Sequence, residues 1–329
     1  MKIRWLLLGL VLTALLGPAV ALTYGRVAQP SGGVWVRLVS FTPYAVALYG
    51  LALLLLLLVW LLSRGGARVL ARLLVVVAAL GLAMHLWWAH RPYVGQAAAA
   101  TEGTHRVTVM TANLMLGQAS PSEVVATAVR DDVDVLVLEE VTPQVLGGMQ
   151  AAGLSQAFPH AAGQAADGAR GTMVFSTRKL SDIARLPTGF GSYRMRVARH
   201  GGSFTLFAVH TRPPAGDAAA WVKDHRAILS AAEGVPGAAV IAGDLNATTD
   251  HRQLQLLAGH DYTDAATEAR AGWQPTWPSD GEVSLAGFPV PTLLPLDHVL
   301  TNPGARALRT EVVSIDGTDH RALVARLEM

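Results

Sequence analysis

The first hundred residues contain three long apolar segments separated by short polar links. They cover residues 5–22, 43–62 and 69–89, and Leu51–Leu62 is an unbroken run of twelve apolar residues. A helix needs about 20 apolar residues to cross a hydrocarbon core, and an amphipathic helix of a soluble protein would interrupt such a run with polar positions. The pattern therefore predicts three transmembrane helices in an all-α membrane region, residues 1–95.

The pattern changes after residues 96–104, which are small and polar and which we expect to form a short tether. From residue 105 to 329, short apolar runs typical of strands are followed by polar tips, as expected for one α/β domain. Strands are expected at 107–112, 133–138, 172–176, 194–199, 203–209, 238–243, 296–300, 307–313 and 322–327. Helices are expected at 120–130, from Thr142 onward, at 218–232 and at 252–257, with a Pro-, Gly- and Trp-rich loop at 273–295. Because no crossover helix fits between the strands from 172 to 209, part of the sheet structure must be antiparallel.

Charge separates the same two parts. Residues 1–100 carry eight Lys and Arg and no acid, a formal charge of +8, whereas the remaining 229 residues carry 18 cations and 24 acids, a formal charge of −6. The basic pI of the sequence thus comes from the membrane part and does not indicate a nucleic-acid-binding face on the soluble part. Cations precede the first segment and crowd the link between the second and third, and such positions lie on the cytoplasmic side. We therefore expect a multi-pass plasma-membrane protein whose soluble domain is extracytoplasmic.

Two features of the membrane region bear on this topology. Lys2 and Arg4, an apolar core and the small residues 19–21 also fit a cleaved signal peptide, which would leave two spans and the same outward-facing domain. Arg72 and His85 lie near the ends of the third segment, where we expect them at the headgroup interface. The absence of cysteine permits an exported domain but does not require one.

A polar group follows each of several apolar strands in the soluble part. The clearest case is AAVIAGDLNA, residues 238–247, in which a buried-strand pattern ends abruptly in GDLN, and such strand tips are where α/β folds place their chemistry. Each tip alone is most simply a polar turn or a satisfied core group, but six in series are not explained by solvation. They are Asn113 in TANL, Glu140 in LVLEEVTP, His210 in FAVHTRPP, Asp244 and Asn246 in GDLNA, Asp297 in LDHVL, and Asp319-His320 in GTDHRALV.

This series resembles the endonuclease/exonuclease/phosphatase family over residues 106–327. GDLN and the DH that precedes the last strand are its most specific parts, and LEEV matches a family pattern usually written LQEV, with Glu139 where Gln is commoner. The resemblance implies a four-layer α/β sandwich, in which two mixed β-sheets are flanked by helices. Some nuclease members carry an acid two residues after the first Asn, where this chain has Met115, which argues against a second metal and against a repair-endonuclease assignment.

The resemblance also implies a metal site. It gives Asn113 and Glu140 as metal ligands, and Asp319 as either a further metal-side carboxylate or an orienting group. A phosphodiester is anionic and repels hydroxide, so a hard cation held by carboxylate and amide oxygens is needed to neutralise it. The implied cofactor is Mg²⁺, with Mn²⁺ as an alternative.

The remaining site residues carry implied roles in the reaction. Asp244 would orient or deprotonate the attacking water, and Asn246 would donate to a phosphoryl oxygen or fix that carboxylate. His320 resembles the family histidine that contacts the phosphate, and Asp297 the acid that sets its tautomer and favours its charged form. His210 would be a second phosphate donor. We expect the Asp297 and His320 side chains to be hydrogen-bonded.

Other histidines are expected at the surface, and His298 is expected to face away from Asp297 on its strand. Trp273 and Trp277 fit either stacking on a base or sugar or covering the edge of the core. The surface set is His160, His200, His225, His251 and His260.

Together these patterns predict a membrane-anchored, Mg²⁺-dependent phosphoesterase. Its substrate would be a phosphate ester of nucleic acid, a lipid headgroup or an inositol phosphate, and its lasting partner the lipid bilayer, with no obligate protein partner indicated. Two alternatives stay open, an extracellular nuclease acting on DNA and a non-catalytic binding domain tethered to the membrane. The substrate does not follow from the sequence, because loops decide it.

Overall fold

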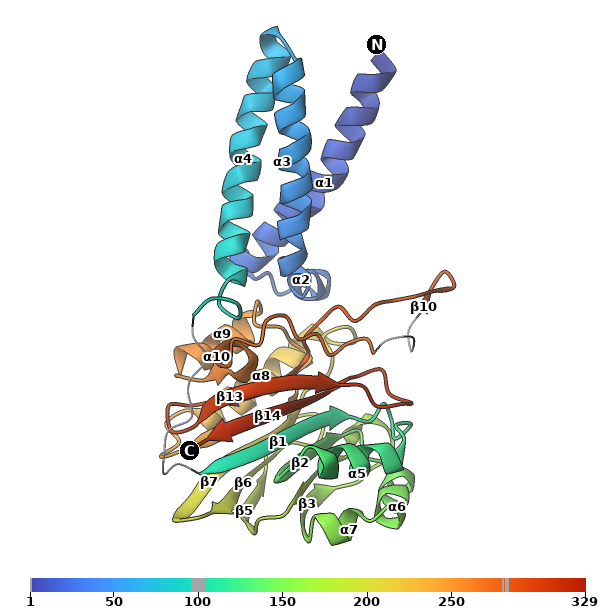
Figure 1. Cartoon of the computed structure of the whole chain (residues 1–329), viewed down its shortest axis with the longest axis vertical. Coiled ribbons are helices and arrows are strands. Elements are labelled where there is room, and N and C mark those ends of the chain that lie inside the picture. The colour runs from blue at the N-terminus through green and yellow to red at the C-terminus, as the bar shows by residue number, and fades with distance from the viewer. Residues whose placement is uncertain (1, 96–104, 280, 282–283) are drawn as a thin grey trace. The chain divides into compact units, whose positions relative to one another are not determined.

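The computed structural model describes residues 2–95, 105–279, 281 and 284–329 (Figure 1). The predicted tether, 96–104, lies outside the described residues. The chain divides into two compact units, one up to Arg91 and one from Pro92 to Met329. Each is described by itself below.

The first unit is entirely helical. It consists of α1 (Lys2–Ala28), α2 (Gly33–Val39), the 3-10 helix η1 (Thr42–Tyr44), α3 (Ala45–Leu62) and α4 (Gly65–Ala89). Three stretches, Trp5–Ala28, Thr42–Leu62 and Gly65–Ala89, are long and apolar enough to cross a membrane. Each coincides with a predicted segment, and α1 continues six residues beyond the predicted end at residue 22.

A buried polar cluster around His85 joins α1, α3 and α4. That side chain is only 1% exposed and points into the bundle. Its Nε2 lies 2.9 Å from the Thr23 hydroxyl, which is also 2.9 Å from the Tyr49 hydroxyl, and its Nδ1 lies 3.1 Å from the Thr42 carbonyl oxygen. The imidazole finds these partners because the helices bury it among them, and sequence position alone did not reveal that packing.

The second unit is built on two six-stranded mixed sheets. One has the order β13-β14-β1-β2-β4-β3 and the other β5-β6-β7-β8-β12-β9. The strands of the first sheet are β1 (Arg106–Asn113), β2 (Val135–Glu139), β3 (His160–Gln164), β4 (Thr172–Ser176), β13 (Arg306–Val313) and β14 (Ala322–Glu328). Those of the second are β5 (Leu180–Arg185), β6 (Tyr193–Arg199), β7 (Gly202–His210), β8 (Ala239–Asp244), β9 (Thr263–Asp264) and β12 (Asp297–Thr301).

Helices cover the outer faces of the sheets, which gives the predicted four-layer sandwich (Figure 1). They are α5 (Pro121–Arg130), α6 (Pro143–Ala151), α7 (Leu154–Ala157), α8 (Ala218–Ala232), α9 (Arg252–Gly259) and α10 (Ala265–Glu268), with a 3-10 turn η2 (Gly168–Arg170). The period of two along β1 separates the layers. Val107 and Val109 face the core between the sheets, whereas Met110 and Ala112 face the core under α5 and α6.

Three strands of the two large sheets were not predicted, and all of them lie at a sheet edge. β3 and β5 expose most of their residues, and β9 has only two. A strand without a buried face lacks the alternating or continuous apolar pattern that reveals strands in a sequence. The predicted loop 273–295 also contains a short hairpin, β10 (Ser284–Leu285) with β11 (Phe288–Pro289).

Candidate active site

The two sheets bring the polar tips to one end of the sandwich. β1 and β2 run parallel, as do β7 and β8, so Asn113 lies opposite Glu139 and His210 opposite Asp244 where these strands end. β12 runs antiparallel to β8 and begins at the same end, where Asp297 is the register partner of Asp244. Sheet topology therefore gathers residues that are up to about two hundred positions apart in the chain.

Asp244 lies at the centre of the cluster and is 1% exposed. Its Oδ2 accepts hydrogen bonds from Asn113 Nδ2 (3.0 Å) and Asn246 Nδ2 (3.1 Å), and its Oδ1 accepts from the Asn246 backbone N–H (2.8 Å). Asn246 has a left-handed backbone (φ 45°), which Asn adopts more readily than most residues. Of the two roles expected for Asn246, the geometry favours fixing the Asp244 carboxylate.

Gly243 is required directly before this carboxylate. A Cβ at this position would lie 1.8 Å from the Val209 carbonyl oxygen, and the backbone has φ 146°. Only glycine allows β8 to approach β7 so closely here. The GD pair of the motif thus combines a packing requirement with the central carboxylate of the cluster.

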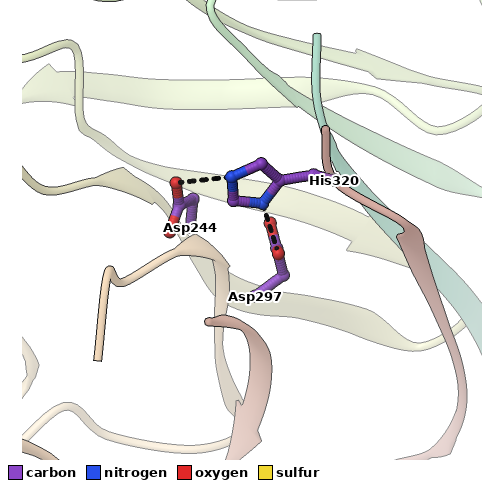
Figure 2. Close-up of side chains that lie close together, drawn as sticks. All are labelled: Asp244, Asp297 and His320. Atoms are coloured by element: carbon purple, nitrogen blue, oxygen red, sulfur yellow. Dashed lines mark hydrogen bonds and ion pairs between the residues drawn. The ribbon is translucent and has the colours of Figure 1, made fainter. Parts of the chain in front are cut away.

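His320 and Asp297 form the expected hydrogen bond, with Nδ1 2.8 Å from Asp297 Oδ2 (Figure 2). The other ring nitrogen, Nε2, lies 3.9 Å from Asp244 Oδ2, so the imidazole bridges two buried carboxylates. Burial by itself would lower the pKa of His320, but the Asp297 and Asp244 carboxylates outweigh it and raise that pKa to about 10. The ring is therefore positively charged at neutral pH.

The two carboxylates respond to the buried site in opposite directions. Burial raises the pKa of Asp244 to about 7, with the Asp297 charge adding to the effect and charged His320 opposing it. Burial also acts to raise the pKa of Asp297, but the charge and hydrogen bond of His320 lower it overall. Asp297 is thus the permanent counter-charge of His320, while Asp244 can take up and release a proton near neutral pH.

His210 lies beside the same carboxylate, with its Nε2 3.6 Å from Asp244 Oδ2 and 3.9 Å from Glu140 Oε1. Burial lowers the pKa of His210 to about 3, and the nearby His320 charge acts in the same direction. This imidazole is therefore neutral, and any contact it makes with a phosphate is a hydrogen bond rather than an ion pair.

Glu140 and Asn113 form the polar edge of the cluster. Glu140 accepts a hydrogen bond from the Leu116 backbone N–H (2.6 Å) and from Asn113 Nδ2 (3.3 Å). Glu140, Met115 and Leu116 all have left-handed backbones, with φ of 58°, 46° and 55°. Such conformations are costly for residues other than glycine and concentrate at functional sites.

Asn113 and Glu140 carry the oxygen ligand types that a hard divalent cation binds, while in this structure Asn113 Oδ1 accepts the Met115 backbone N–H (2.9 Å) and its Nδ2 faces Glu140 Oε1 (3.3 Å). Asn113 is 2% exposed, whereas the Glu140 side chain is 15% exposed, so one ligand is held rigidly and the other borders solvent. Mg²⁺ prefers this combination, because it binds few protein oxygens and keeps several waters. A second group of potential ligands is Asp244, Asp297 and His320, whose ligand atoms all lie within 4.8 Å of one another.

Asp319 contacts a tryptophan rather than the other proposed metal ligands. Its Oδ2 accepts a hydrogen bond from Trp277 Nε1 at 3.0 Å. Within the described residues, no hydrogen bond joins it to Asn113 or Glu140. Of the two roles expected for Asp319, this contact favours the orienting one.

Glu139 is a member of the cluster that sequence reasoning treated only as a neighbour of Glu140. It is fully buried at the end of β2, its Oε1 accepts a hydrogen bond from the Thr111 hydroxyl (2.9 Å), and its Oε2 has no hydrogen-bond partner. Burial, reinforced by the Asp297 and Asp244 charges, raises the pKa of Glu139 well above its usual range. Its substitution for the commoner glutamine was the only signal in the sequence.

Two histidines expected at the surface are buried behind the GDLN turn, so that expectation was wrong for them. His225 and Trp221 on α8 donate to the backbone carbonyls of Leu245 (3.0 Å) and Asn246 (3.1 Å). His251 Nδ1 accepts from the Thr248 backbone N–H at 2.9 Å. His200 and His260 are exposed and His160 is half-buried, while His298 faces away from the site toward Asp264 (2.8 Å).

Comparisons with known proteins place this arrangement among related folds. The family model described as "Endonuclease/Exonuclease/phosphatase family" matches residues 110–320. The structure is similar to a humanized D. rerio TDP2 carrying 14 mutations (TM-score 0.56, 15% identity, covering 68% of this chain and 99% of that chain). It is also similar to an endonuclease/exonuclease/phosphatase from Bacteroides vulgatus (TM-score 0.52, 13% identity, covering 68% and 99%). No curated protein matches the sequence.

Proposed function

The chain belongs to the endonuclease/exonuclease/phosphatase family, and we propose that it is a membrane-anchored, Mg²⁺-dependent phosphoesterase. Members of this family are metal-dependent phosphoesterases and nucleases, and the chain is accordingly a metal-dependent hydrolase acting on ester bonds. Membrane anchoring is supported by the three long apolar helices, and an extracytoplasmic domain by the positions of the cations.

The observation that carries the proposal is the arrangement of Asp244 and His320. A carboxylate whose pKa is raised to about 7 lies 3.9 Å from an imidazolium whose pKa is raised to about 10. The first can accept a proton from an attacking water, and the second can stabilise negative charge on a phosphoryl oxygen. Few structural roles require such a pair to be buried together.

In the proposed reaction, water adds across a phosphate ester bond. Asp244 orients the attacking water and takes its proton, while Asn246 and Asn113 hold this carboxylate through their side-chain amides. His320 pairs with a phosphoryl oxygen, and Asp297 keeps the ring oriented and charged. Asn113 and Glu140 would hold Mg²⁺, which when bound supplies positive charge against the phosphate and the leaving oxygen.

The substrate class is open at this level of inference. A D. rerio TDP2 similar in fold (TM-score 0.55, 13% identity) is described as complexed with a single-strand DNA product. Nucleic acid is therefore one candidate, although the formal charge of −6 on residues 101–329 does not favour binding a polyanion. A non-catalytic binding domain is disfavoured because every member of the proposed site is present.

The test is a substrate panel. The full chain in lipid nanodiscs would be incubated with Mg²⁺ and single-stranded DNA, plasmid DNA, inositol phosphates, phospholipids or a soluble chromogenic phosphodiester. We expect hydrolysis of at least one ester that stops on adding EDTA and in Asp244→Ala, but persists in Glu233→Ala, which changes an exposed carboxylate (60% exposed). Activity that survives in Asp244→Ala, or no activity on any ester, would contradict the proposal.

Topology has its own test. A reporter that is active only outside the cytoplasm would be fused after Met329, and a cytoplasm-specific reporter at the same position serves as control. Activity of the second reporter alone would show that the domain faces the cytoplasm.

A further inference from the structure

The catalytic unit carries a projecting apolar element, which we call the finger. Its arms are Thr276–Ser279 and Leu293–Leu296, and its tip is Ser284–Val290, which contains β10 and β11. Figure 1 shows this hairpin extending away from the body of its domain. At the tip, Leu285 and Phe288 are 74% and 75% exposed, more than any other large apolar side chain described from residue 105 onward.

The tip presents these two side chains as a unit. Leu285 and Phe288 are register partners across the hairpin, joined by Ala286 (φ 50°) and Gly287 (φ 83°) in a two-residue turn. Cross-strand partners lie side by side on one face of a hairpin. The two side chains therefore form one contiguous apolar patch at the outer end of the finger.

The arms tie this patch to the rim of the candidate active site. Trp277 pairs with Leu294 through two backbone hydrogen bonds of 2.7 and 2.8 Å and donates its indole N–H to Asp319. The Thr276 hydroxyl accepts the backbone N–H of Asp297 at 3.2 Å. The finger thus begins at the residues beside His320 and ends in an exposed apolar tip.

The composition of the finger indicates which class of partner it contacts: nucleic acid, protein or bilayer. No charged residue occurs from Ser284 to Leu296, so the tip offers nothing to pair with the phosphates that dominate nucleic-acid binding. A stable protein interface buries roughly 1,200–2,000 Å², far more than two side chains can supply. A bilayer needs only a small apolar insertion when the protein is already held beside it.

The apolar helices of the same chain would hold the domain beside a bilayer. The last of the three helices that can span a membrane ends at Ala89. The chain from there to His105 can extend no further than ~60 Å at ~3.6 Å per residue. The effective concentration of the tip near the membrane is therefore high, and two apolar side chains suffice for reversible contact.

We infer that Leu285 and Phe288 insert into the bilayer that the helices span, and that the site thereby acts on the phosphate ester of a membrane-lipid headgroup. The substrate half of this inference rests on the proposed phosphoesterase activity. In the reaction, water oxygen forms a bond to phosphorus, the bond from phosphorus to an alcohol oxygen of the lipid breaks, and that alcohol leaves with a proton. The inferred insertion into the bilayer is argued from the finger and does not depend on the proposed activity.

Membrane contact is testable with single labels, because the sequence contains no cysteine. Full-length Phe288→Cys would be labelled with an environment-sensitive fluorophore and reconstituted in nanodiscs, with Val129→Cys on α5 (54% exposed) as matched control. We expect lipid-borne nitroxide to quench the Phe288 label and not the Val129 label, with aqueous iodide showing the reverse. Quenching of both labels by iodide alone, or shielding of the Phe288 label from both quenchers, would overturn the inference.

Substrate selection is tested by a ratio of activities. Leu285→Ser/Phe288→Ser would be compared with wild type on headgroup-labelled phospholipid vesicles and on a soluble phosphodiester. We expect the ratio of lipid to soluble hydrolysis to fall at least about tenfold, which corresponds to ~1.4 kcal/mol of lost membrane contact. An unchanged ratio would overturn the lipid assignment, whereas absence of all hydrolysis in wild type would refute the proposed function and leave the quenching result standing.

Discussion

Replacing Asp297 by Asn should disable His320 without removing it. The carboxylate lies 2.8 Å from His320 Nδ1, closer than Asp244 at 3.9 Å from Nε2, so we assign it most of the effect that raises the pKa of His320 to about 10. The interval from the ordinary histidine value near 6.5 corresponds to roughly 5 kcal/mol in favour of the charged ring. Without this carboxylate, burial favours the neutral ring. Activity should then fall on the order of 10²- to 10⁴-fold.

The pH dependence separates this mechanism from a general structural defect. The wild-type ring keeps its charge until the pH approaches its pKa of about 10, whereas without the Asp297 carboxylate burial lowers the pKa of the ring and its charge is lost as the pH rises. The deficit of Asp297→Asn relative to wild type should therefore widen as the pH rises from 5 to 9. Initial rates on the substrate found in the panel, with thermal unfolding to verify the fold, provide the measurement.

A double-mutant cycle completes the test. Because Asp297 acts through His320, adding His320→Ala to Asp297→Asn should cost little beyond the worse single variant. Losses that multiply, or a deficit that does not vary with pH, would show that Asp297 does not act by charging and orienting this ring.

Three further predictions concern stability. Burial raises the pKa of Asp244 from 3.8 to about 7, so the wild-type domain should lose stability as the pH rises through that window. Metal-free Asp244→Asn should therefore be more stable than wild type at pH 8 by on the order of 2–4 kcal/mol, and by less at pH 4. An equal difference between the two proteins in thermal melts at both pH values would contradict this. His225→Leu should lower unfolding stability by about 0.5–1.5 kcal/mol and reduce activity, because it removes one of two hydrogen bonds to the buried Leu245 carbonyl of the GDLN turn, the other coming from the Thr211 hydroxyl. Normal rates would show that the turn does not need this support. In detergent, Thr23→Val should destabilise the helical unit by about 0.6–1.7 kcal/mol, because it removes the hydrogen bond to His85. Thr13→Val, at an exposed position on the same helix, should not destabilise it. Equal melting temperatures of the two variants would argue against the buried cluster.

Local sequence patterns were enough to predict most helices and strands and to list the candidate site residues. Burial imposes a period or a continuous apolar run on neighbouring residues, so several elements could be predicted from the sequence. Examples are the three apolar segments, the helix at Ala218–Ala232 and the strand at Thr172–Ser176. The polar tips were readable for the same reason, since each interrupts such a run. The family resemblance then assigned their roles in advance.

Which of these groups lie in contact, and which of them are charged, depends on the folded arrangement of the two sheets. Asp244 and Asp297 are register partners only because β12 pairs antiparallel with β8, and that pairing joins segments more than fifty residues apart. The burial of His85 and His225, like the exposure of the finger tip, depends on what distant elements cover. A residue's neighbours along the chain fix its backbone preference, but its pKa and hydrogen-bond partners come from neighbours in space, which no local pattern encodes.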